Sequence, residues 1–220
     1  MSAGVPPVPA PVSGAAVAPR PGPAPRMRAL RTARLRLEPQ RAAHADEMFQ
    51  VLSDPAIYTY ENAPPTSLQA LRERYGRLES RRSGDGSQLW LNWVLRVPAH
   101  GLIGYVQASV LPGGRASIGY ELASAHWGRG YAQEAVGAML DELARRYGVR
   151  GVSAVLKRPN ERSRRLLERL GFMMAPSEAH GPAGAEPDEL LMHRSLGLDG
   201  RGADGPSSAA MNPPPTRETT

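Results

Sequence analysis

The chain has 220 residues, no cysteine and a formal net charge of +6 at pH 7. This length fits one domain with a core of ordinary size once biased tails are set aside, so we expect no second large domain. The absence of cysteine excludes disulfides, thiolate metal sites and a cysteine nucleophile, and it is compatible with the reducing cytoplasm, where we expect the protein to act.

Both ends of the chain differ in composition from the middle. Residues 1–27 hold eight of the 22 prolines, and residues 197–220 are rich in Gly, Pro, Ser and Ala. Such segments cannot offset the entropy of ordering, so we predict two disordered tails around one domain at residues 28–196. The first tail lacks the pattern of a secretory signal, and no stretch is apolar for long enough to span a bilayer. Met27, just before the first predicted strand, is an alternative candidate for the first residue.

The first part of the domain predicts a strand, two helices and a linker between the helices. Residues 34–38 read as a strand and residues 40–52 and 67–81 as helices, the second because apolar side chains recur on one face. The linker is polar, aromatic and stiffened by two prolines, so it is suited to lining a binding cleft. Its candidate residues for that role are Tyr58, Tyr60 and Glu61. Core aromatics beside a plain surface loop are the alternative interpretation.

The middle of the domain predicts an antiparallel meander. Residues 88–97 and 102–110 read as strands joined by a turn at 98–101. A second turn at 111–114 leads into a third strand, which ends at Glu121.

A glycine-rich turn follows this strand and opens a long amphipathic helix, whose apolar residues recur at helical spacing from Ala132 to Leu143. The N–H groups at the start of a helix bind anions, and glycines in the turn bear no side chains that would hold a pyrophosphate away. The candidate phosphate-binding residues are Trp127, Gly128, Arg129, Gly130, Tyr131 and Ala132. Taken alone, such a turn is equally typical of ordinary turn chemistry.

A second unit of strand, turn and helix follows the first. Residues 149–156 form a β-branched run, Asn160 precedes a short helix at 161–170, and Gly171 ends that helix. A last strand is predicted at 189–195.

With these two units the chain resembles the GNAT superfamily of acetyl-CoA-dependent N-acyltransferases, within it the branch of ribosomal-protein N-terminal (alanine/serine) acetyltransferases. One matching motif is residues 127–132 with Glu134 and Ala135 following, and the other is Asn160 with the helix that ends at Gly171 and Phe172. The resemblance covers roughly residues 28–196. It implies a single α/β (α+β) domain, with a mixed, mostly antiparallel sheet flanked by helices and a cleft for acyl-CoA between two strands that splay apart.

The resemblance also implies roles at the end of the third meander strand. The backbone amides of Leu122 and Ala123 would stabilise the oxyanion of the tetrahedral intermediate. Glu121 would remove a proton from the attacking amine, directly or through a water. Plain strand pairing, and a surface carboxylate at a strand end, are the alternative interpretations.

Further roles fall on the later helix. Asn160 would hydrogen-bond the pantetheine arm. The cluster of Arg162, Arg164 and Arg165 would meet phosphates of the cofactor if this helix packs beside it, and Arg164 is the candidate residue. Many relatives place a tyrosine where Leu167 stands here, so Ser163 becomes the candidate proton donor to the thiolate, with orienting or capping as its alternative role.

The expected function is transfer of an acetyl group from acetyl-CoA to a primary amine, a protein or peptide N-terminus above all, in a ternary complex. Acetylation of a small amine, amino acid or antibiotic, and a non-catalytic acyl-CoA-binding module, stay as alternatives. Five scattered histidines predict no metal site, and the modest arginine clusters are more typical of solvated helix faces than of nucleic-acid binding. We expect no membrane partner, and a monomer or a homodimer.

Overall fold

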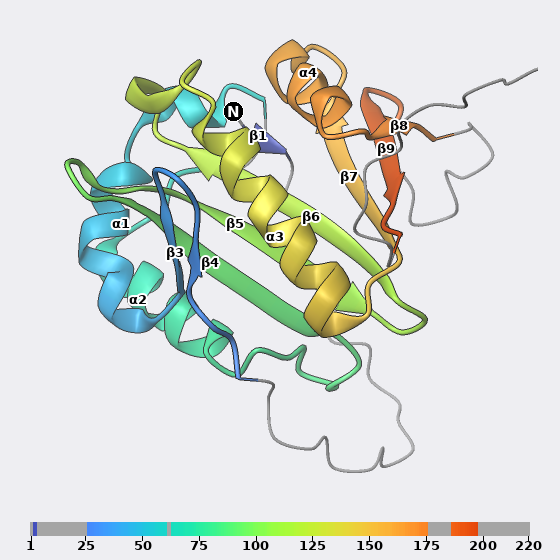
Figure 1. The fold of residues 1–220 in the computed structure, drawn as a ribbon. Helices are drawn as coiled ribbons and strands as arrows, with labels where there is room; N and C mark the ends of the chain where they lie inside the picture. Colours follow the sequence, from blue (N-terminus) through green and yellow to red (C-terminus); the bar gives the residue numbers. More distant parts are fainter. Residues whose placement is uncertain (1, 4–25, 61–62, 176–185, 198–220) are drawn as a thin grey trace, which may run out of the picture.

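The computed structural model describes residues 2–3, 26–60, 63–175 and 186–197 (Figure 1). Most of the two predicted tails, residues 1–27 and 197–220, and the linker residue Glu61 lie outside the described residues. The predictions made for them stay predictions.

The described strands are β1 (Ser2–Ala3), β2 (Leu30–Arg31), β3 (Arg36–Pro39), β4 (Leu89–Val97), β5 (Gly101–Leu111), β6 (Arg115–Leu122), β7 (Gly151–Lys157), β8 (Met173–Met174) and β9 (Glu189–Ser195). They form one sheet in the order β2-β3-β4-β5-β6-β7-β9-β8, with β1 paired to β6 off this path. All neighbours run antiparallel except β6 and β7, which are parallel. The predicted mixed, mostly antiparallel sheet is thus confirmed.

Helices cover both faces of the sheet. The helices α1 (Ala45–Val51) and α2 (Leu68–Leu78) pack on one face, and α3 (Tyr131–Tyr147) and α4 (Glu161–Arg169) pack on the other (Figure 1). The alternation of β4 explains the two cores, since successive side chains of a strand point to opposite faces. Trp93 joins the large core under α3, while Val94 joins the smaller core under α1 and α2. None of the described helices combines the length and the apolar character needed to cross a bilayer.

The parallel strands β6 and β7 diverge. Their pairing covers Arg115 to Ser117 of β6 and Gly151 to Ser153 of β7, although β6 continues to Leu122 and β7 to Lys157. A gap therefore opens between the carboxyl ends of two neighbouring strands, as the expectation of splayed strands requires. The short strand β1 lies in this gap: it pairs with β6, with Ser2 opposite Glu121, and it also contacts β7.

The early helices begin later than predicted because local hydrogen bonds shape their first turns. The backbone N–H of Arg41 donates to Nδ1 of His44 (3.1 Å), and a short 3-10 helix (Ala42–His44) precedes α1. The Ser67 hydroxyl accepts from the Ala70 amide (3.0 Å), so Ser67 is the N-cap of α2 rather than its first residue.

Candidate active site

The glycine turn before α3 has the backbone of an anion-binding loop. Gly128 has φ +73° and Gly130, the N-cap of α3, has φ +78°. Residues with a side chain rarely adopt this left-handed conformation, so both positions favour glycine. In the described part of the chain no side chain caps α3, and its first free N–H groups, at Tyr131 and Ala132, lie at the turn. These N–H groups and the positive end of a 17-residue helix can bind a phosphate.

Arg34, which the sequence did not single out, holds this turn in place. Its Nη1 donates to the Arg129 carbonyl oxygen (2.8 Å), and its Nη2 lies 2.6 Å from Oε2 of Glu134. Its guanidinium also lies 4.6 Å from the centre of the Tyr131 ring. Although burial alone would raise the pKa of Glu134, hydrogen bonds from Thr32 and Arg34 hold that pKa below its ordinary value. The turn is therefore tied to the segment between β2 and β3.

Trp127 links the glycine turn to β6 and to α4. Its Nε1 donates to the Leu122 carbonyl oxygen (2.8 Å), and the guanidinium of Arg162 lies 4.6 Å from its ring centre. A cavity of about 360 Å³ opens beside this pair, lined by Ala56, Ile57, Thr59, Tyr60, Trp127, Asn160, Glu161 and Arg162. The cavity brings together residues predicted separately for cofactor and acceptor binding.

The arginine of α4 at this cavity is Arg162 and not Arg164. Arg164 instead forms ion pairs along its own helix, at 2.7 Å to Glu161 and 2.6 Å to Glu168. Its guanidinium is held by two carboxylates, one turn away on either side, and the predicted contact of Arg164 with cofactor phosphates stays a prediction.

Asn160 and Ser163 together shape the start of α4. Oδ1 of Asn160 accepts from the Ser163 amide (3.2 Å), which makes Asn160 the N-cap of the helix. Asn160 is 1% and Ser163 0% exposed, and the Tyr120 hydroxyl donates to the Ser163 carbonyl oxygen (3.5 Å). Of the two roles predicted for Ser163, these contacts favour orienting and capping over proton donation.

The end of β6 offers one backbone amide to the gap. The Ala123 amide donates to the Ile103 carbonyl oxygen (2.9 Å), so it belongs to the ladder between β5 and β6. Successive peptide groups of a strand point to opposite edges, so the Leu122 amide points away from β5 and toward the gap. Because the Ala123 amide already has a partner, the Leu122 amide is the better candidate for the oxyanion, and the role expected of the two amides stays a prediction.

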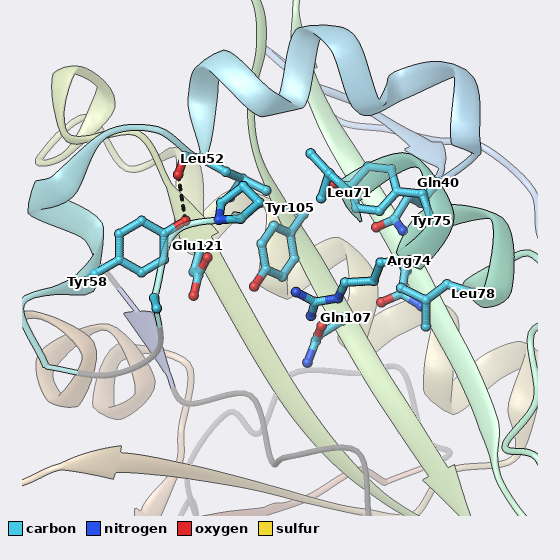
Figure 2. Close-up of a pocket in the computed structure, with 13 residues that line it drawn as sticks. Gln40, Leu52, Tyr58, Leu71, Arg74, Tyr75, Leu78, Tyr105, Gln107 and Glu121 are labelled. Atoms are coloured by element: carbon cyan, nitrogen blue, oxygen red, sulfur yellow. Dashed lines mark hydrogen bonds between the residues drawn. The ribbon is translucent and has the colours of Figure 1, made fainter. Parts of the chain in front are cut away.

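Glu121 lies on the opposite face of β6 from the large core, in a second cavity of about 130 Å³. Figure 2 shows its carboxylate between Tyr58 and Tyr105, under the helices α1 and α2. The Tyr58 hydroxyl donates to the Leu52 carbonyl oxygen (2.7 Å). Burial raises the pKa of Tyr58 and of Tyr105, and the negative charge of Glu121 raises both further. Glu121 is 3% exposed, so it is a buried carboxylate at a pocket and not a surface one.

The predicted acceptor residues divide between the two cavities. Tyr58 lines the cavity with Glu121, whereas Tyr60 lines the cavity with Trp127. The sequence did not single out the polar residues that share the cavity with Glu121, which are Gln40, Arg74, Tyr75, Asn92, Tyr105 and Gln107. One signal was available: Asn92 interrupts the apolar run from Leu89 to Leu95 of β4, on the face opposite Trp93.

Comparison with known proteins gives consistent matches. The family described as "Acetyltransferase (GNAT) domain" matches residues 34–173. An uncharacterized N-acetyltransferase p20 of Bacillus licheniformis is 30% identical over 149 residues, which are 66% of this chain and 83% of that protein.

Two solved structures share the fold. RimL, a ribosomal L7/L12 alpha-N-protein acetyltransferase in complex with coenzyme A, superposes with a TM-score of 0.64 at 18% identity, over 76% of this chain and 97% of that one. A spermidine N-acetyltransferase from Vibrio cholerae, in complex with CoA and spermine, gives 0.61 at 19% identity, over 74% and 96%. These two likenesses concern the fold alone.

Proposed function

This chain belongs to the GNAT acetyltransferase family and is an acetyl-CoA-dependent N-acetyltransferase, and we propose that it acetylates the N-terminus of a protein or peptide by direct attack in a ternary complex. The observation that carries the proposal is the place of Glu121. Among the described residues that line the cavity of about 130 Å³, Glu121 is the one carboxylate, and it is adjacent in the chain to Leu122, whose amide points toward the gap.

Three features support acetyl-CoA binding along the gap between β6 and β7. The free N–H groups at the start of α3 fit a pyrophosphate, and Gly128 and Gly130 leave space for it. The edge of β6 that faces the gap pairs with extended backbone at β1, and the pantetheine arm would take the place of β1 there. A pantetheine arm, which also carries amides, is a ligand of the same kind. When bound, acetyl-CoA supplies the activated acetyl thioester.

Two residues at the end of β6 would then act on the reacting groups, Glu121 on the amine and Leu122 on the thioester oxygen. The acceptor amine attacks the thioester carbon, a carbon–nitrogen bond forms, the carbon–sulfur bond breaks, and the proton lost by the amine passes to Glu121 directly or through a water. The Leu122 amide donates a hydrogen bond to the oxygen that becomes negatively charged. An α-amine has a pKa of about 8, so a carboxylate of ordinary strength suffices as the base.

Asn160 and Ser163 would position α4 beside the gap. Coenzyme A thiolate is a stable leaving group, so the reaction does not depend on a strong acid at this point. We therefore assign Ser163 an orienting role, in keeping with its complete burial and with the cap that Asn160 forms.

The test is release of coenzyme A thiol from acetyl-CoA in the presence of peptides, polyamines, amino acids and aminoglycosides. The protein contains no cysteine, so it adds no thiol of its own. We expect release with peptide N-termini. Release with small amines instead would show that the acceptor is a small amine. No thiol release from protein that binds acetyl-CoA would favour a non-catalytic acyl-CoA-binding module.

A further inference from the structure

We infer that the acceptor of this enzyme carries a carboxylate as well as its amine, and that Arg74 binds that carboxylate. The inference rests on the proposed function, because it assigns the second end of the cavity whose first end holds Glu121. The acceptor chemistry that fits is an acidic residue with a free α-amine, whether a free amino acid or the first residue of a peptide.

The cavity has a negative group at one end and a positive group at the other. Among its described lining residues, Glu121 is the one acid and Arg74 the one base. Figure 2 shows the Glu121 carboxylate on one side of the Tyr105 ring and the Arg74 guanidinium on the other. A ligand that spans Tyr105 therefore meets a negative group at one end and a positive group at the other.

The guanidinium of Arg74 has no charged or hydrogen-bonding partner in the described part of the protein. No hydrogen bond or ion pair joins its guanidinium to another described residue, whereas its neighbour Arg72 pairs with Asp46. Burial raises the pKa of Tyr75 and of Tyr105, and the positive charge of Arg74 opposes that rise in both. The guanidinium thus acts on the interior of the cavity although its side chain starts at an exposed position of α2.

Two more donors line the same end. Nε2 of Gln40 and the hydroxyl of Tyr75 are buried and have no hydrogen-bond partner among the described residues. Each of these residues is 3% exposed, and both line the cavity. Because buried donors are rarely left without a partner, these two indicate a ligand or water that accepts from them. The phenol of Tyr75 stays protonated, since burial raises its pKa, and so it donates.

These three donors favour an anionic group over the alternatives. Arg, amide and phenol groups together suit a carboxylate, which only accepts hydrogen bonds and binds guanidinium strongly. A polyamine would place a second cation against Arg74, and the described lining offers it a single carboxylate. The shared fold with a spermidine N-acetyltransferase therefore does not extend to an acceptor end suited to polyamines.

The experiment compares acceptors that differ in one charge. Peptides with an amidated C-terminus and an N-terminal Asp or Glu are paired with the same peptides beginning with Asn or Gln, and free aspartate, free glutamate and spermidine are added. We expect kcat/KM for the acidic member of each peptide pair to be about tenfold higher, from one charge-assisted hydrogen bond. Whichever has the higher kcat/KM, the acidic peptide or the free amino acid, shows whether the acceptor is a peptide N-terminus or a free amino acid.

The variant Arg74→Gln should abolish this preference, through a higher KM for acidic acceptors, while the KM for acetyl-CoA is unchanged. The matched control is Arg77→Gln, which removes an exposed arginine of the same helix that does not line the cavity, and it should keep the preference. Equal rates within the pairs, a preference that survives Arg74→Gln, or spermidine as the best acceptor would each overturn the inference.

Binding separates this inference from the proposed function. Calorimetry of acidic and neutral peptides with CoA-loaded protein measures the Arg74 contact without turnover. Binding of acidic peptides that depends on Arg74, with no thiol release, would support the inference and contradict the catalytic proposal. Turnover of neutral acceptors, with neither binding nor turnover of acidic ones, would support the catalytic proposal and contradict the inference about Arg74.

Discussion

The substitution Gly104→Ala tests whether catalysis depends on the backbone position of Glu121. Gly104 lies in β5 opposite Leu122 of β6, beside the irregular register between Leu95 and Arg96 of β4. A Cβ at Gly104 would lie 2.1 Å from the Glu121 carbonyl oxygen and 2.8 Å from Cα of Leu122. Both are backbone atoms, so no side chain can rotate away to make room.

The size of the displacement follows from these distances. The contact with the carbonyl oxygen falls about 1.3 Å short of an ordinary van der Waals distance of 3.4 Å. The end of β6 must move by roughly that amount, or β5 and β6 must separate. Misplacement of a catalytic group by about 1 Å costs on the order of 100-fold in rate, and overpacking costs about 1–3 kcal/mol of stability.

We therefore expect Gly104→Ala to lower kcat about 100-fold and the free energy of unfolding by about 1–3 kcal/mol. The assay is thiol release at saturating acetyl-CoA and acceptor, with urea denaturation of the same preparation. The matched control is Gly76→Ala in α2, where a Cβ meets no atom within 4 Å, and it should keep full activity. A folded Gly104→Ala protein with the kcat of the wild type would refute the argument that the close approach of β5 sets the site.

Three other substitutions test the glycine turn before α3, the role of Glu121 as the base, and the hydrogen bond that joins Asp54 to Ser124. Gly130→Val puts a branched side chain at φ +78° with its Cβ 3.3 Å from Nη2 of Arg34, so acetyl-CoA affinity in calorimetry should fall at least about tenfold; unchanged affinity removes the assignment. Glu121→Gln should lower kcat about 100-fold or more while acetyl-CoA binding is kept, and an undiminished kcat across a pH series contradicts the base role. Asp54 accepts from the Ser124 amide (2.7 Å), and although burial alone would raise its pKa, hydrogen bonds hold the pKa below its ordinary value. Its stabilisation is complete above the unfolded pKa of about 3.9 and is lost as the pH falls through the folded value, so Asp54→Asn should cost about 1 kcal/mol at pH 7 and little in acid; a cost independent of pH would count against this account.

The parts of the site that the sequence predicts are those fixed by neighbours in the chain. Gly128 and Gly130 are predictable because a left-handed backbone before a helix has a local signature. The ion pairs of Arg164 have a local signature as well. Its spacing of three and four residues from Glu161 and Glu168 is the spacing of ion pairs on one helix.

The parts that the sequence does not predict depend on residues far apart in the chain. Arg34 reaches Arg129 across 95 positions, and nothing beside Arg34 signals that contact. Arg74 and Gln40 reach the cavity of Glu121 from two different elements, and their roles follow from how α2 packs on the sheet. Local chemistry thus predicts the backbone of the glycine turn, whereas the contacts of Arg34 and the lining of the Glu121 cavity need the tertiary structure.

The divergence of β6 and β7 has a thermodynamic consequence. Parallel pairing joins these strands over three positions, from Arg115 opposite Gly151 to Ser117 opposite Ser153. Beyond these positions the two halves of the sheet are connected through what lies in the gap, which in this structure is β1. A ligand that binds both strand edges adds its binding energy to folding, about 2.7 kcal/mol at a concentration 100 times its Kd. The unfolding midpoint should rise with acetyl-CoA concentration, and hydrogen exchange should slow at residues 118–122 and 154–157 first. Acetyl-CoA bound in this gap, as proposed, would thus stabilise the fold as well as supply the acetyl group.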